Sequence, residues 1–407
     1  MANVSSSNSQ KDYPQLRLKA ADGGVFPAWK SVTMGQLYQE RKTPGNETLP
    51  ILSVSIHTGV SDGSLDEDEL GKRVKRSEDK SLYKQALTGD LVFNMMRAWQ
   101  GAIGVVKTPG MVSPAYIVAE PNEGVYPPFM DFLFSTPQMI NRIHRLSYGV
   151  TDFRLRLYWD SFVSIDCRIP QVDEQMKIAQ FLSKIEQKID AQQRLINALK
   201  SYKRGLVFAL FKPDNRFRIE MVSVPMTALL TEYRCQKSEG LRVCSVAVNK
   251  GIVDQVEHLG RSFSAADTSH YGRVKPGDIV YTKSPTGNFP FGIVKQSKMN
   301  EEVAVSPLYG VYTPRTPSTG ALLHIYFEQS ENANNYIRTL AQKGAKNTIN
   351  ITSNRFLEKS ILFPAHETDC VTIAGFFDTL DQRITLEEQA LNDLERQKRG
   401  LLSKMFI

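Results

Sequence analysis

An internal duplication is the feature of this sequence that most limits how the chain folds. Residues 178–211 and 373–406 share their apolar positions, and both carry Lys-Arg-Gly-Leu shortly before a final Phe. Each residue of the second run lies 195 positions after its counterpart, as Ile373 follows Ile178 and Lys398 follows Lys203. A match at constant offset predicts two copies of one structural unit, which decides the architecture before any local pattern is considered.

The regions before these runs repeat more loosely. Residues 89–93 (Gly-Asp-Leu-Val-Phe) match 277–281 (Gly-Asp-Ile-Val-Tyr), and residues 104–107 match 292–295. The offset drifts between matches, which places insertions in loops. We therefore divide the chain into a polar, disordered leader, two globular domains that each precede a long helix, and the helices themselves. The boundaries are 1–13 for the leader, 14–169 and 213–363 for the domains, and 170–212 and 364–407 for the helices.

Short runs rich in Val, Ile, Phe and Tyr, separated by Gly, Pro and Asn, predict strands in both globular regions. Residues 91–93, 103–107, 115–118, 279–281 and 292–295 are the expected strands. Residues 129–134, 139–146 and 322–340 are expected to be helical. The predicted fold class is α+β, with two α/β domains in tandem, each of about 150 residues and each followed by a long helix.

The two long stretches have the pattern of a coiled coil. Pro170 and Pro364 stand just before them, where a helix tolerates proline. Apolar residues then recur at steps of four and three over about four heptads. One amphipathic helix lying on a globular core is the alternative, but two matched seams favour pairing with each other. The seam residues are Ile178, Leu182, Ile185, Ile189, Gln192, Ile196, Leu199 and Leu206 in the first helix, and Ile373, Phe377, Leu380, Ile384, Glu387, Leu391, Leu394 and Leu401 in the second.

One central position of each seam is polar. Gln192 and Glu387 lie halfway along their seams, so they meet whether the helices pair parallel or antiparallel. The long globular domain between the helices favours the antiparallel arrangement. A buried polar pair costs stability but fixes register. We therefore expect that replacing both residues with Leu raises the melting temperature and loosens the register; a lower melting temperature would count against this hypothesis.

Charge and cysteine content limit the class of partner and the compartment. The formal net charge is +7, a modest basic excess that suits a polyanionic partner without establishing one. None of the four cysteines forms a Cys-x-x-Cys pair, and no His pair has zinc spacing, so we expect free thiols in a reducing cytoplasm. No apolar run is long enough to suggest a membrane span.

The order of domain, helix, domain, helix resembles the specificity subunit of type I restriction–modification systems. The residues that carry this resemblance are the helix opening at 169–179 (Ile-Pro-Gln-Val-Asp-Glu-Gln-Met-Lys-Ile-Ala), the Lys-Arg-Gly-Leu closings, the Gly-Asp strand starts and residues 29–37. The second copy departs at residues 364–368, which lack the Glu-Gln pair. It also has residues 221–224 (Met-Val-Ser-Val) in place of the segment that begins at Trp29. The resemblance covers nearly the whole chain after Pro14.

The resemblance implies a non-catalytic subunit that reads DNA in the cytoplasm of a bacterium or archaeon. Each globular domain is then a target-recognition domain for one half of a split DNA sequence, and the antiparallel helices set the gap. Two methyltransferase subunits that use S-adenosylmethionine dock on the helices, and a restriction subunit that uses ATP and Mg²⁺ joins them. The first seam rises roughly 42 Å, the length of about 12 base pairs, so the two domains are expected to meet DNA about one turn apart.

Candidate DNA-reading residues lie in two loops of each copy. Base readout in the major groove needs hydrogen-bond donors and acceptors on protruding loops, and these loops differ between copies while their flanking strands match. For each residue an ordinary solvated turn is the alternative. Lys203, Arg204, Lys398 and Arg399 are open to two interpretations, phosphate contact or partner interface. The loop candidates are Asn94, Arg97, Trp99, Gln100, Tyr148, Arg154 and Arg156 in the first copy, and Lys283, Ser284, Thr286, Asn288, Lys343, Lys346 and Asn347 in the second.

No catalytic motif is found in the sequence. A phosphate-binding Gly-x-x-x-x-Gly-Lys-Ser/Thr loop is absent. Residues 288–291 (Asn-Phe-Pro-Phe) resemble the turn of an adenine methyltransferase only superficially, and we interpret them as a loop entering a strand. The acidic run at 66–69 is interpreted as a solvated loop and not as a metal site. We therefore expect no catalytic residue, metal or cofactor in this chain.

Three other functions stay open. A self-contained DNA-modifying enzyme disagrees with the missing cofactor and nuclease motifs, and an assay for methyl transfer by the isolated chain would test it. A purely structural coiled-coil scaffold disagrees with the basic charge and the divergent domains, and DNA binding at varied salt would test it. The third alternative is the equivalent subunit of a related defence or methylation system with other enzyme partners.

Overall fold

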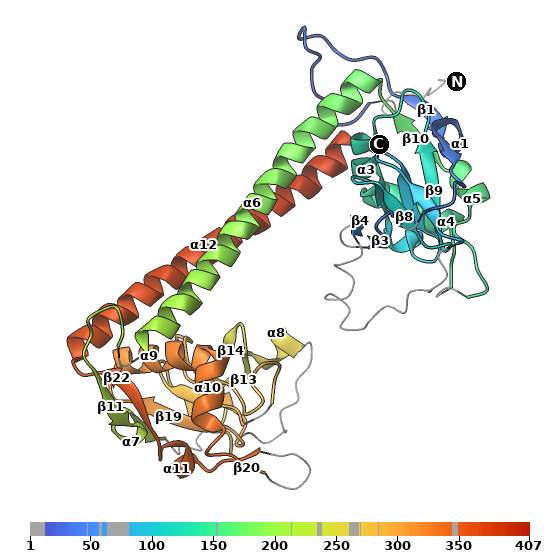
Figure 1. Cartoon of the computed structure of the whole chain (residues 1–407). Coiled ribbons are helices and arrows are strands. Elements are labelled where there is room, and N and C mark those ends of the chain that lie inside the picture. Colours follow the sequence, from blue (N-terminus) through green and yellow to red (C-terminus); the bar gives the residue numbers. More distant parts are fainter. Residues whose placement is uncertain are drawn as a thin grey trace, which may run out of the picture. The chain divides into compact units, whose positions relative to one another are not determined.

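The computed structural model describes residues 13–46, 48–56, 59–62, 81–151, 154–212, 214–233, 238–259, 268, 270–283, 285–343 and 349–407. It forms two compact units, one of residues Met1–Gln192 with Ala390–Ile407 and one of residues Gln193–Gln389. Each unit contains one globular domain and about half of each long helix, α6 (Val172–Leu210) and α12 (Glu367–Met405) (Figure 1). The leader up to residue 12 and the acidic run 66–69 lie outside the described residues.

The first unit is built on a four-stranded antiparallel sheet. Its strand order is β2 (Tyr38–Glu40), β9 (Tyr116–Pro121), β6 (Leu91–Asn94) and β7 (Ile103–Val105). Three strand pairs join it: β3 (Leu52–Ser55) with β4 (Gly59–Asp62), β5 (Lys84–Ala86) with β8 (Gly110–Val112), and β1 (Lys30–Thr33) with β10 (Asp166–Ile169). The helices are α1 (Met34–Leu37), α3 (Pro127–Phe134), α4 (Pro137–Leu146), α5 (Trp159–Val163) and the 3₁₀ turn η1 (Ala98–Gln100).

The second unit repeats this topology. Its main sheet has the order β12 (Leu230–Glu232), β19 (Gly310–Pro314), β16 (Ile279–Tyr281) and β17 (Val294–Gln296). A second sheet contains β14 (Gly251–Asp254), β13 (Val243–Ala247), β18 (Val303–Val305) and β15 (Gly272–Val274). The pairs β11 (Met221–Pro225) with β22 (Ser360–Pro364) and β20 (Gln342–Lys343) with β21 (Ile349–Asn350) complete the strands. The helices are α7 (Met226–Leu229), α8 (Gln255–Leu259), α9 (Pro317–Glu328), α10 (Ser330–Ile337) and α11 (Ser353–Phe356).

The duplication predicted from the sequence is therefore a duplication of fold, and the predicted α+β class is confirmed. Residues 221–224, which lack the Trp29 motif, still form strand β11 and pair with β22 as β1 pairs with β10. The single helix expected over residues 322–340 is wrong. Gln329 adopts an extended conformation (φ −79°, ψ 121°), which ends α9 and starts α10. After this break, Tyr336 and Ile337 of α10 are buried in the same core as Phe327 of α9.

The Gly-Asp pair before the central strand of each sheet has a structural role. Gly89 and Gly277 have φ of 94° and 88°, a conformation that glycine adopts without strain. The following carboxylates are buried and accept a backbone N–H three residues earlier, Leu87 N to Asp90 and Lys275 N to Asp278, both at 2.8 Å. The Asp90 carboxylate also accepts hydrogen bonds from Arg41 Nε at 2.8 Å and Arg41 Nη2 at 3.2 Å. The motif thus fixes the turn that starts β6 and β16.

Replacing Asp90 with Asn is expected to destabilise the first unit more than Asp278→Asn destabilises the second. Asn keeps an acceptor for the backbone N–H in both variants, but only D90N loses the charged partner of Arg41. A hydrogen bond to a charged group contributes roughly 1.5 kcal/mol, and Glu120, 3.0 Å from Arg41 Nη2, offsets part of the loss. Hydrogen exchange of the β6 amides in the Asp90 variant and of the β16 amides in the Asp278 variant measures the two effects. Equal losses of protection would contradict this account.

The Glu-Gln pair at the opening of α6 anchors the loops around it. Gln175 is fully buried; its Oε1 accepts from Tyr126 N at 2.8 Å and its Nε2 donates to Pro170 O at 2.9 Å. The carboxylate of the buried Glu174 accepts a hydrogen bond from Arg17 Nε at 2.8 Å. The chain around Leu16, which follows the leader, is bound to α12 as well, because Leu16 N donates to Lys404 O at 2.9 Å.

Within each unit the two long helices run antiparallel. In the first unit Glu186 of α6 accepts from Lys398 of α12 at 2.6 Å, and Leu182 shares a core with Leu402. In the second unit Lys200 lies 2.6 Å from Glu388 and Lys203 lies 2.7 Å from Asp381. A later residue of α6 thus contacts an earlier residue of α12, as in an antiparallel pair. The predicted seam positions are buried or half-buried in both helices. Glu387 binds Arg383 of its own helix at 2.6 Å, and its pairing with Gln192 stays a prediction.

The two interhelical lysines are equivalent positions of the repeat. Lys203 and Lys398 occupy the same place in the Lys-Arg-Gly-Leu closings, and their partners Asp381 and Glu186 also match at the same offset. Lys203 additionally lies 2.6 Å from Glu328 at the end of α9. Both ammonium groups are bound to carboxylates of this chain, which gives each lysine a role between the helices. Phosphate contact and partner interface stay open for these lysines and for Arg204 and Arg399.

Candidate nucleic-acid interface

The first candidate loop of copy one follows β6 and is folded around two of its own side chains. Asn94 Oδ1 accepts from Met96 N at 3.0 Å, and Trp99 Nε1 donates to Met96 O at 3.0 Å. The half-buried Trp99 ring also packs against His144 of α4, with ring centroids 5.6 Å apart. Asn94 and Trp99 therefore shape the loop, while Arg97 and Gln100 are left exposed at its tip.

The second candidate loop of copy one lies beside the first. Tyr148 and Arg156 exchange two backbone hydrogen bonds of 2.9 and 3.0 Å, and Leu157 N donates to Met95 O at 2.9 Å. Gly149 is required in this hairpin, because a Cβ there would lie 2.2 Å from Arg154 O. The Tyr148 side chain is 52% exposed and its ring lies 4.9 Å from that of Tyr158. The chain thus brings together two loops that are about 50 residues apart.

Three arginines give this surface its charge. The side chains of Arg97, Arg154 and Arg156 are exposed, and in the part of the chain that the structure describes none of them has an ion-pair partner. An unpaired guanidinium is suited to phosphate oxygens and, through its fork of donors, to the O6 and N7 of guanine. With Gln100 and Tyr148 the first copy presents donors, acceptors and an aromatic ring on one connected surface.

Sequence reasoning missed the basic end of α4. His144 and Arg145 are exposed in the last turn of this helix, directly before the second loop. The signal was present in the sequence, because residues 137–146 are an amphipathic helix whose polar face ends on these two residues. Both extend the basic surface around Arg97 and Tyr148, since the His144 ring contacts Trp99.

The first candidate loop of copy two has a different geometry. Thr282 is buried, and its hydroxyl accepts from Ile293 N at 3.0 Å, which closes the base of the loop. Thr286 and Phe289 form a tight turn through two backbone hydrogen bonds, with the Phe289 ring in the core. Thr286 and Asn288 are exposed at the turn, and Asn334 of α10 donates to Asn288 O at 3.2 Å. The Asn-Phe-Pro-Phe segment is thus a turn anchored on the domain.

Lys283 is less available than its place in the loop suggests. It is half-buried with φ of 57°, and burial lowers the pKa of its ammonium. Ser284, Lys346 and Asn347 lie outside the described residues, as does the side chain of Lys343, whose backbone forms the end of β20. Of the second-copy candidates, Thr286 and Asn288 are therefore the two that the structure places at an exposed turn.

The described residues offer neither a metal site nor a reactive thiol. No group of three or more His, Cys, Asp or Glu side chains there is arranged to hold a metal ion. Cys167, Cys244 and Cys370 are buried free thiols, and burial raises the pKa of Cys167 to about 12. In the same part of the chain, no helix combines the length and apolarity that crossing a membrane requires.

Comparison with solved structures shows which fold this is. The S subunit of a type I restriction–modification system from M. genitalium is similar over 97% of this chain and 99% of that chain, with a TM-score of 0.56 and 11% identity. A chain from a structure of complex assembly and conformational transition of the type I R-M system is similar over 93% of this chain and 98% of that chain, with a TM-score of 0.54 and 17% identity. No protein-family model and no curated protein matches the sequence.

Proposed function

Because this chain has the fold of type I restriction–modification specificity subunits, we propose that it is the DNA-reading subunit of such an enzyme. One observation carries this proposal: two domains share a strand framework, yet the loops at the same place in each differ in sequence and conformation. A duplicated scaffold with divergent loops suits a protein that reads two different half-sites, because specificity resides in side chains that reach the base edges.

In this proposal the chain binds DNA without catalysing a reaction, and partner subunits carry out methylation and cleavage. Two methyltransferase subunits would dock on α6 and α12 and supply the S-adenosylmethionine site. A restriction subunit would bring the sites for ATP and Mg²⁺. The antiparallel helices would set the gap between half-sites, and the complex would work in the bacterial or archaeal cytoplasm. The equivalent subunit of a related defence or methylation system is the second candidate, with the same DNA-reading role and other enzyme partners.

Sequencing of modified bases in the source genome, with and without this gene, tests the proposal. Loss of methylation at one split motif, two short halves with a fixed gap, is expected on deletion. Unchanged methylation in a strain that expresses the partner methyltransferase would overturn the role in modification. Binding of the purified complex to the identified motif, compared with a scrambled duplex, then measures specificity directly.

Arg97 in the first domain and Lys283 in the second are expected to contribute unequally to DNA binding. Arg97→Ala is expected to weaken specific binding about tenfold and to relax the preference at one base pair, because its exposed guanidinium stands at the loop tip. Lys283→Ala, in the second copy, is expected to have a smaller effect because that side chain is half-buried. Binding to duplexes with each base pair of the target changed measures both. A uniform loss across all duplexes would assign Arg97 to the phosphate backbone.

A further inference from the structure

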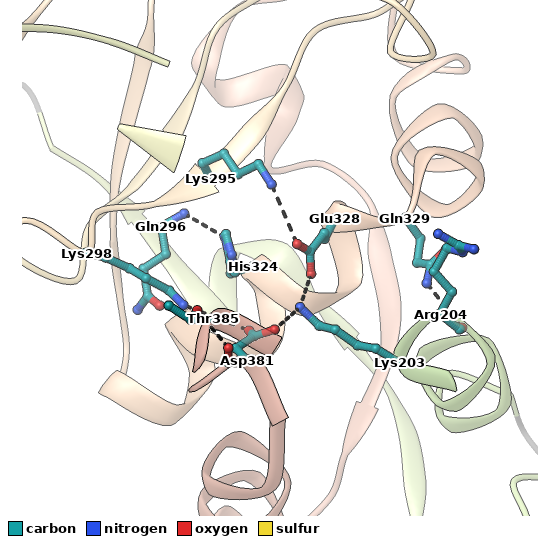
Figure 2. A network of polar contacts seen from close by, with 10 residues as sticks. All are labelled: Lys203, Arg204, Lys295, Gln296, Lys298, His324, Glu328, Gln329, Asp381 and Thr385. Carbon is teal, nitrogen blue, oxygen red and sulfur yellow. Dashed lines mark hydrogen bonds and ion pairs between the residues drawn. The ribbon is translucent and has the colours of Figure 1, made fainter. Parts of the chain in front are cut away.

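A polar cavity of about 780 Å³ lies entirely within the second unit. Its walls come from α6, α12, the turn between β13 and β14, the chain that follows β17, and the C-terminal end of α9. Figure 2 shows the network of polar side chains among its lining residues. The cavity is separate from the candidate DNA-reading loops, because none of their residues lines it.

Cations outnumber anions in this lining, six to three. The carboxylates of Glu388, Asp381 and Glu328 are already engaged, at 2.6–2.7 Å, by Lys200 and Lys203. The remaining cations have only long contacts or none with these carboxylates, since Lys295 and Lys298 each lie 4.0 Å from their nearest one. The cationic lining residues are Lys200, Lys203, Arg204, Lys250, Lys295 and Lys298.

Two buried groups in the lining have unused hydrogen-bonding capacity. Lys295 is 4% exposed, and among the described residues its ammonium has no hydrogen bond. Burial lowers the pKa of Lys295, as expected for an ammonium that is removed from water without a close counter-ion. His324 is 8% exposed and its Nδ1 accepts from Gln296 N at 3.1 Å. The neutral ring therefore carries its proton on Nε2, for which no acceptor is found in the described part of the chain.

Among the described residues of the first unit, the same place has the strand acceptor but no buried lysine beside it. Asp131, three residues before the buried Phe134 at the end of α3, stands where His324 stands before Phe327 in α9. Its carboxylate accepts from Val105 N at 2.9 Å. The residue that holds the place of Lys295 in the strand register is Gly104, not Lys107 as the sequence match indicated, because Gly104 pairs with Val92 as Lys295 pairs with Val280. The first unit thus satisfies the equivalent strand N–H with Asp131 and has no lysine side chain at the place of Lys295, so the buried charge of Lys295 needs another explanation.

We propose that this cavity binds a small phosphorylated ligand of the nucleoside di- or triphosphate class. Phosphate oxygens would accept from Lys295, Lys298 and the His324 Nε2–H, which supplies the missing counter-charge. The volume is in the range of small-molecule sites. An apolar part of the ligand would lie against the aliphatic side of the lining, which is formed by Val207, Val248, Ile252, Met299 and Ile384.

Calorimetric titration of the purified full-length chain with ADP, without divalent metal and at low salt, tests this proposal. One site per chain is expected. Lys295→Met should weaken binding at least tenfold and should fold, because it removes a poorly paired buried charge. Lys298→Met, at a 58% exposed side chain, is a second variant with the same expectation and little risk to folding. Lys107→Met is the control, at an exposed lysine of the first unit whose place in the strand register corresponds to that of Lys298, and should bind ADP as the unaltered chain does.

Titrations with other ligands show which part of ADP is recognised and whether DNA phosphates bind instead. Tripolyphosphate should bind and adenosine should not, because the ligand is recognised through its phosphates. Absence of ADP and tripolyphosphate binding at millimolar concentration overturns the proposal. So does equal binding by the Lys295→Met variant, or equal weakening by Lys107→Met, which would indicate unspecific attraction. If only a non-target DNA duplex binds and Lys295→Met weakens it, the cavity contacts the DNA backbone and the small-ligand assignment is wrong. None of these outcomes alters the methylation test of the proposed function.

Discussion

Replacing Lys203 with Met is expected to destabilise the second unit by roughly 2–4 kcal/mol, the range for breaking a buried ion pair reduced for the partial exposure of its carboxylates. The Lys203 side chain is 11% exposed, and its ammonium lies between Glu328 at 2.6 Å and Asp381 at 2.7 Å. Burial alone would raise the pKa of Glu328, but Lys203, His324 and Lys295 outweigh it and the pKa is lowered. Without Lys203 two carboxylates share one site and repel each other. Met keeps the apolar stem, so the change isolates the charge.

The duplication supplies the control for this experiment. Lys398 occupies the same repeat position in the first unit, but it is 28% exposed and has one partner, Glu186, which is 41% exposed. Lys398→Met is therefore expected to cost less than about 1 kcal/mol, as for other exposed ion pairs. Hydrogen exchange of α9 in the first variant and of α3 in the second measures the two effects. Equal losses of protection would show that the triad of Lys203, Glu328 and Asp381 adds nothing beyond an ordinary surface pair.

The architecture of this chain was accessible from the sequence because a repeat can be compared with itself. The matched Gly-Asp turns and the two seams predicted two α+β domains, each with a long helix, and the topology of both units agrees. The break at Gln329 was not predicted, because residues 328–335 are mostly polar without the Gly or Pro that usually marks the end of a helix. Packing against the sheet decides that turn.

The function of single side chains was harder to predict than the fold. Asn94 and Trp99 have the residue types expected of a base-reading loop, yet both bind their own loop through Met96. Nothing in the sequence distinguishes such a residue from Arg97, which is exposed. The role of Lys203 depends on helix register, because its acidic partner lies on another helix. A signal existed nonetheless: the partners Glu186 and Asp381 repeat at the same offset as the lysines.

His324 is expected to make the second unit less stable in mild acid. Burial, and then the nearby Lys295, lowers its pKa from 6.5 to about 3. The unfolded chain takes up a proton as the pH falls through 6.5, whereas the folded chain does not, so the free energy of unfolding decreases with falling pH throughout this window. Lowering the pH from 7 to 5 should therefore cost about 2 kcal/mol from this one group. The charged groups that face it are Lys203, Lys295, Lys298 and Glu328; the pKa of Lys203 is raised by its carboxylate partners and that of Glu328 is lowered by Lys203, so this ion pair stays charged over the range.

Urea denaturation followed by circular dichroism at pH 7 and pH 5 measures this effect. His324→Asn keeps an acceptor for Gln296 N–H but does not titrate, so the difference in stability between the two pH values should shrink by about 2 kcal/mol. His270→Asn, at an exposed histidine of the same unit, should leave the pH dependence unchanged. Carboxylates that titrate near pH 5 contribute equally to all three proteins and cancel in the comparison. If His324→Asn retains the full pH dependence, then the histidine is protonated in the folded chain, and its ring donates to a carboxylate instead of accepting from β17.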